Sequence, residues 1–178
     1  MAYTFLDPKI GTLDAPSATG TERRWPLGIE ADAQDFPFGA SSAPALGKFV
    51  YCQGVASGGT AGALVQFAGY SASVMSAANS ASRLPLGFAA GALTATNVYG
   101  WVQVQGIVTN AYGTNESFAA GIPLYLNATA GQVCSVTSLG NHLQGVCVYK
   151  SLASTQVNGS SAYLQINYPH IAGLTASQ

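Results

Sequence analysis

The side chains that could carry out catalysis or hold a metal are few in this 178-residue chain, and they are far apart in sequence. Beyond residue 48 there are only two histidines, His142 and His170, and one acidic residue, Glu116. Catalysis requires titratable or nucleophilic groups gathered in one place, and a zinc site needs several ligands together. No segment matches a nucleophile elbow, a P-loop, a dinucleotide-binding fingerprint or a zinc-protease motif. We therefore expect no enzyme activity, no cofactor and no bound metal.

The three cysteines do not change this expectation. Cys52, Cys134 and Cys147 are an odd number and lack the spacing of a metal or redox motif. Cys134 and Cys147 lie in apolar segments, where a thiol behaves as a small hydrophobic group. The N-terminus has neither the basic region nor the long apolar segment of a secretion signal. We interpret the cysteines as buried free thiols of a protein made in a reducing cytoplasm.

Charged residues are scarce and unevenly distributed. They make up 7% of the chain, against about a quarter in an ordinary soluble domain. Ten of the thirteen lie within residues 1–48, and the formal net charge is -1. No basic stripe is present, so nucleic-acid binding is not expected, and no apolar run is long enough to span a membrane. The acidic residues Glu30, Asp32 and Asp35 lack the further ligand spacing of a calcium loop.

The segment Tyr99-Gly100-Trp101-Val102-Gln103-Val104-Gln105-Gly106 is the clearest strand in the sequence. Its alternation directs Val102 and Val104 to one face, which we expect to be the core, and Trp101 and Gln103 to the other. The segment Tyr163-Leu164-Gln165-Ile166 repeats this order of residue types. A large aromatic side chain beside an uncharged amide suits a surface that is partly wet and partly covered by a partner.

Residues 1–45 predict an extended arm. Prolines at positions 8, 16, 26, 37 and 44 exclude long helices and central strands. Single apolar residues between turn formers could dock on another surface or fold back over the chain's own body. The stretch Arg23-Arg24-Trp25-Pro26 is the most typical of an interface, because Arg and Trp dominate binding hot spots.

Residues 46–178 predict an all-β body of eight or nine short strands, forming a small barrel, a β-tulip or a sandwich. The order of the segments at 47–52, 62–67 and 85–90 recurs at 121–126, 131–136 and 143–148. The spacing is not conserved, so the pattern indicates a degenerate internal duplication. A body this poor in charge is either kept wet by its polar residues or covered by identical subunits or a larger assembly.

Several motifs follow one another in a characteristic order. A strand at 47–52 is followed by residues 86–90, by the Tyr99–Gly106 segment, by Ala119-Ala120-Gly121-Ile122-Pro123-Leu124-Tyr125, and by a strand at Gly145-Val146. Over roughly residues 46–168 this order resembles the decoration, or cement, proteins of tailed bacteriophage capsids. The resemblance implies a small β-barrel or β-tulip virion protein that assembles, usually as a trimer, on the outside of the head. It also implies that the protein binds major capsid subunits and bridges them against internal pressure.

Two alternatives stay open beside this function: a head-fibre or host-recognition module that binds carbohydrate, and a main building block of a shell or tube. For the decoration function the predicted partners are the major capsid protein and further copies of the chain, on the outer surface of the virion. The candidate interface residues are Arg23, Arg24, Trp25, Phe36, Phe38, Trp101, Gln103, Tyr163 and Gln165.

Overall fold

The computed structural model is all-β, as the sequence predicts. It describes residues 3–8, 10, 15–35, 45–78, 84–114, 116–135, 141–151 and 162–172. Eleven strands form one sheet, and no α-helix occurs among the described residues. The strands are β1 (Thr4–Phe5), β2 (Glu30–Asp35), β3 (Ala45–Gly54), β4 (Leu64–Ala68), β5 (Ser71–Val74), β6 (Leu86–Ala89), β7 (Tyr99–Ala111), β8 (Pro123–Leu126), β9 (Val133–Cys134), β10 (His142–Lys150) and β11 (Ala162–Ile171).

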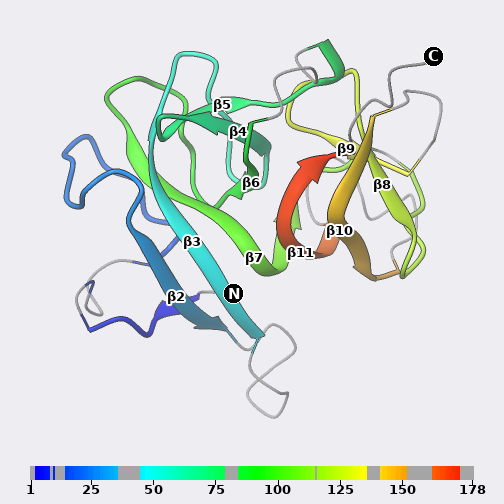
Figure 1. Ribbon diagram of the computed structural model, residues 1–178, viewed down its shortest axis with the longest axis horizontal. Helices are drawn as coiled ribbons and strands as arrows, with labels where there is room; N and C mark the ends of the chain where they lie inside the picture. Colours follow the sequence, from blue (N-terminus) through cyan, green and yellow to red (C-terminus); the bar gives the residue numbers. More distant parts are fainter. Residues whose placement is uncertain are drawn as a thin grey trace.

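Strand β7 connects the two halves of the sheet (Figure 1). Its first half, from Tyr99 to Gln105, pairs with β3, and its second half, from Gln105 to Ala111, pairs with β11. The strand changes partner at Gly106, whose φ is +104°. A Cβ atom there would lie 2.2 Å from the carbonyl oxygen of Leu46, so only glycine fits this bend.

Five strands form a ring in the first half of the body. β3 pairs with β5, β5 with β4, β4 with β6, and β6 with β7, while β7 also pairs with β3. The side chains inside the ring are apolar, and among them are Val50, Val65, Val102 and Val104. The predicted alternation along β7 is therefore confirmed for the two valines. Burying each such side chain stabilises the fold by about 1.5–3 kcal/mol.

The second half continues the sheet as β11–β10–β8–β9 and does not repeat the ring. The pairing of β10 with β11 corresponds to that of β6 with β7, but β8 pairs with β10 where β3 pairs with β7. Of the predicted duplication, the sheet therefore repeats only the pair β6–β7 as β10–β11. The order of the other strands and the closure of the ring are not repeated. One large apolar cluster joins the halves, with Leu64 and Phe88 from the ring packed in the same cluster as Leu124 and Leu164.

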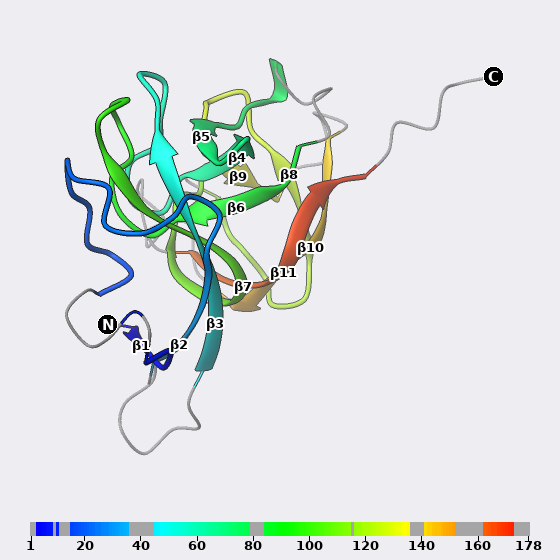
Figure 2. The same cartoon turned by 60° about the vertical axis from the view of Figure 1, so that its left-hand side comes forward.

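The described part of the predicted arm lies on the chain's own body. β2 pairs antiparallel with β3 along six residues, and β1 pairs with β2 (Figures 1 and 2). The sequence leaves open whether the arm docks on another surface or folds back over its own body. The described residues of the arm fold back on the body. Ala31 and Ala33 of β2 face inward and are buried, whereas Glu30 and Asp32 face solvent.

Candidate functional site

The aromatic face of β3 and β7 is covered by the N-terminal segment of the same chain. The ring of Phe5 lies 4.7 Å from that of Trp101, and the ring of Tyr51 lies 5.0 Å from it on the neighbouring strand. Trp101 is only 1% exposed. We predicted a face half wet and half covered by a partner. The face is instead buried, because residues 3–35 supply apolar side chains that close over it.

Gln103 is also buried, and its amide holds the bend of β7 together. Its Nε2 donates to the carbonyl oxygens of Gln105 and Ile107, both at 3.2 Å. The hydroxyl of Tyr3 donates to the carbonyl of Ile107 at 2.6 Å. Burial is the main cause that raises the pKa of Tyr3. Gln103, which the sequence predicts as an interface residue, thus donates hydrogen bonds to backbone carbonyls beside the bend at Gly106.

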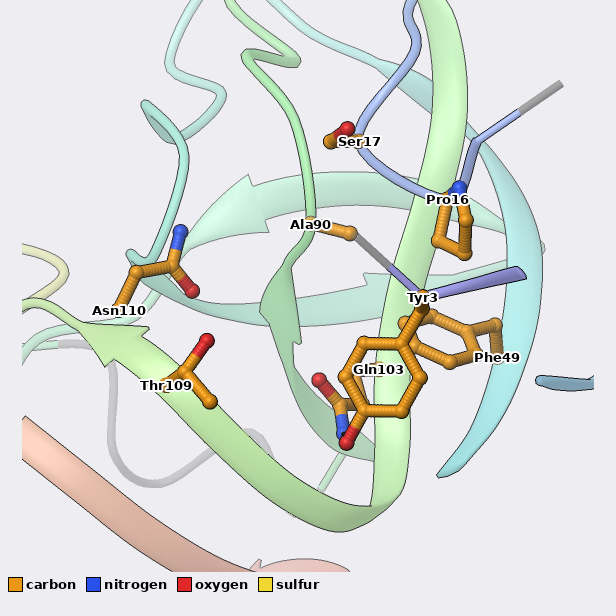
Figure 3. Close-up of a pocket in the computed structure, with 8 residues that line it drawn as sticks. All are labelled: Tyr3, Pro16, Ser17, Phe49, Ala90, Gln103, Thr109 and Asn110. Carbon is orange, nitrogen blue, oxygen red and sulfur yellow. Dashed lines mark hydrogen bonds between the residues drawn. The ribbon is translucent and has the colours of Figure 1, made fainter. Parts of the chain in front are cut away.

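These side chains lie beside a cavity of about 250 Å³ at the edge of the covered face. Figure 3 shows the ring of Tyr3 in front of Phe49, with the Gln103 amide next to the Tyr3 hydroxyl and Thr109 on the same strand nearby. The lining comes from the chain's own N-terminal segment, from β7, and from Phe49 of β3 and Ala90. The cavity therefore depends on the position of the arm.

The basic stretch of the arm lies next to the same aromatic cluster. Arg23 and Arg24 are exposed, and Trp25 is half-buried against the cluster. The backbone N–H of Arg24 donates to the hydroxyl of Tyr51 at 3.3 Å. Arg24 and Trp101 both line a cavity of about 290 Å³. The fold thus brings together two predicted interface residues that lie 77 positions apart in the sequence.

The second aromatic and glutamine face, on β11, is open. Gln165 is exposed opposite Cys147 of β10, and Tyr163 is half-buried with the Lys150 ammonium 5.7 Å from its ring centre. A shallow depression of about 310 Å³ runs over this pair of strands beside Gln165. We call the outward side chains Cys147, Tyr163 and Gln165 the open strip. Phe36 and Phe38, the remaining predicted interface residues, lie outside the described residues.

The acidic and histidine side chains beyond residue 48, which are the candidates for catalysis, each contact a different neighbouring residue. Glu116 accepts hydrogen bonds from the backbone N–H and the hydroxyl of Ser135. The ring of His142 packs against Tyr125 at 5.4 Å, and His170 lies 2.8 Å from the side-chain oxygen of Gln144. Within the described ranges, no three His, Cys, Asp or Glu side chains are grouped as metal ligands would be.

Burial also determines the state of one thiol. Cys52 points into the ring, and burial raises its pKa to about 12. Cys134 is buried as well, whereas Cys147 is partly exposed on the open strip.

No helix among the described residues is long and apolar enough to cross a membrane.

No protein-family model, curated protein or solved structure matches this chain. The resemblance to capsid decoration proteins therefore stays a prediction.

Proposed function

We propose that the protein is a structural virion protein that binds the outer surface of a bacteriophage capsid and stabilises it by bridging major capsid subunits. In this proposal it is made in the bacterial cytoplasm and acts as a homotrimer on the particle. One observation carries the proposal. Of two faces with the same order of residue types, the chain buries one with its own N-terminal segment and leaves the other, the open strip, uncovered.

The open strip has the composition of a contact surface and not of a solvated face. An aromatic ring, an amide and a thiol can lose water at little cost, provided the amide finds a hydrogen-bond partner. A stable interface needs roughly 1,000 Å² or more of buried surface, so the strip would form the centre of a larger contact. Many copies bound to one particle multiply modest contacts into strong retention.

The exposed guanidinium groups of Arg23 and Arg24 supply a second type of contact. They adjoin Trp25, which packs against the covered face, and Arg24 lines a cavity together with Trp101 of that face. Arginine pairs with carboxylates in fixed, often bidentate geometry, so this pair could fix orientation on a shell subunit or a neighbouring copy. Two separate contact regions on one chain are what bridging two subunits requires.

The test is binding to tailed-phage capsids that lack the protein, measured as occupancy after sedimentation. We expect the wild-type chain to bind in a fixed ratio to the shell subunit, and Gln165→Arg to lower occupancy strongly, because a charge would be buried in the contact. Asn97→Arg, in an exposed turn before β7, is the matched control and should bind normally. Full occupancy by the Gln165→Arg variant, or no sedimentation of the wild-type chain, would contradict the proposal.

A further inference from the structure

A second cavity, away from the open strip, is built differently from the others. It has a volume of about 430 Å³ and lies between the start of β2, the ring strands and the end of β11. Its floor is apolar and is formed by Val50, Phe67, Leu86 and Val104, all less than 10% exposed. This volume is within the range of small-molecule sites, which are mostly apolar with a few placed polar groups.

Two tyrosines stand at the rim with unusual backbone conformations. Tyr70 has φ +65° and Tyr168 has φ +46°, and no other non-glycine residue in the described ranges has a positive φ. Both side chains are open to solvent, 44% and 48% exposed. That both such residues are tyrosines, and that both line one cavity, is the observation that singles out this site.

The conformation of Tyr70 follows from a tight turn. Gly69 and Tyr70 form the two-residue connection between β4 and β5, where both residues need a positive φ and Gly or Asn is preferred. The ring of Tyr70 lies over Gly28, where a Cβ atom would come within 2.3 Å of Cζ. The position of the Tyr70 ring thus depends on a turn position that favours glycine, which Tyr70 itself occupies, and on the lack of a side chain at Gly28.

The conformation of Tyr168 follows from a bulge in β11. Residues 167–169 lie opposite the single residue Gly145, because Val146 pairs with Ile166 and Gln144 with His170. Tyr168 also precedes Pro169, and a proline favours extended backbone in the residue before it, so the bulge imposes the positive φ of Tyr168 against that preference. Strain of this kind persists where the surrounding structure enforces it, and it is concentrated at functional sites.

Polar groups complete the rim. The His170 ring is held at 3.2 Å from the Tyr168 carbonyl oxygen, which accepts, and at 2.8 Å from the Gln144 side chain. Glu30 lines the cavity and lies 3.6 Å from the Lys48 ammonium. Lys48 lies near enough for Asp32, and to a lesser degree Tyr168, to raise its pKa. At the rim, the Glu30 carboxylate therefore offers acceptor oxygens beside two exposed tyrosine rings.

We propose that this cavity binds a pyranose ring of a neutral carbohydrate. One apolar face of a sugar ring can stack on Tyr70 or Tyr168, while its hydroxyls donate to the Glu30 carboxylate, which lines the same cavity. The charges favour a neutral sugar over other ligands. The carboxylates of Glu30 and Asp32 repel an acidic sugar, and the Lys48 ammonium lies 3.6 Å from Glu30 and 3.8 Å from Asp32, where it offsets the attraction of these carboxylates for a cationic ligand.

The test uses the full chain and a panel of neutral mono- and oligosaccharides, with sialylated oligosaccharides and choline as comparison ligands, in saturation-transfer NMR and calorimetry. We expect saturable binding of at least one neutral saccharide. At least one of Tyr70→Gly and Tyr168→Gly should weaken it about tenfold or more, because the ring on which the sugar stacks is lost. Glycine adopts a positive φ without strain, so both variants should keep the native circular dichroism spectrum.

Tyr149→Ala is the matched control, since Tyr149 is 45% exposed but does not line the cavity. It should bind like the wild-type chain. Three results would overturn the proposal: no neutral saccharide binds, only choline or the sialylated ligands bind, or both glycine variants stay folded and bind with unchanged affinity. Capsid binding is measured separately, so failure here leaves the test of the open strip intact.

Discussion

Strands β7 and β11 carry the same order of residue types with opposite outcomes. On β7, Trp101 and Gln103 are 1% and 5% exposed, whereas on β11 Tyr163 is half-buried and Gln165 is exposed. The two strands lie next to each other in the sheet. The difference arises from described residues of the N-terminal segment, among them Phe5, Ala31 and Ala33, which pack in one apolar cluster with Trp101. A strand pattern therefore indicates which side chains share a face, while the rest of the chain decides whether that face stays open.

The strongest test of this comparison is truncation of the two aromatic side chains. Trp101→Ala should lower the free energy of unfolding by about 3–5 kcal/mol, because it leaves a cavity under the N-terminal segment. Tyr163→Ala should lower it by about 1 kcal/mol, since Tyr163 keeps part of its surface in water. Urea denaturation of both variants measures the contrast. Equal losses would show that the two faces do not differ as described.

The two glutamines provide a test of intermediate size. Gln103→Ala removes the amide donor of two buried carbonyl contacts and should cost about 1–3 kcal/mol. Gln165→Ala changes an exposed side chain and should alter stability by less than about 0.5 kcal/mol. The same denaturation experiment applies. A neutral Gln103→Ala variant would contradict the role of this amide in holding the bend of β7.

The smallest expected effect is the pH dependence of stability that the buried Cys52 thiol causes. The pKa of Cys52 is raised from 9.0 to about 12 by burial, so the folded state keeps its proton where the unfolded state loses it. Stability from this group is fully present below pH 9 and falls as the pH rises toward 12. At pH 10 the loss is about 1 kcal/mol. Denaturation midpoints from pH 8 to 10 should fall less in Cys52→Ala than in the control Cys147→Ala, whose thiol is on the open strip.

Much of the body could be predicted from local pattern. The strand at β7, the inward Val102 and Val104, and most other strands of the body follow from alternation and from glycine at the boundaries. The strand β5 does not follow from local pattern, because residues 71–74 are mostly serine and alanine, which have weak strand preference.

The arm and the cavity of the further inference were harder to predict, for a physical reason. β2 has the sequence Glu-Ala-Asp-Ala-Gln-Asp, whose residue types are depleted in strands, and it forms because Ala31 and Ala33 fit against the aromatic face of β3. The rim tyrosines, Tyr70 and Tyr168, depend on a turn and a bulge that bring together residues nearly a hundred positions apart. Single-strand periodicity carries no information about such contacts.

The two ends of the eleven-stranded sheet are β1 and β9, and each is only two residues long. Unpaired backbone at a long strand edge recruits further strands and leads to fibres, and most proteins oppose this with charged side chains. This chain has few charges that could act in that way, but the two outermost strands of its described sheet are short. Backbone pairing at these two ends can add only short strands, which disfavours fibre-like extension of the sheet.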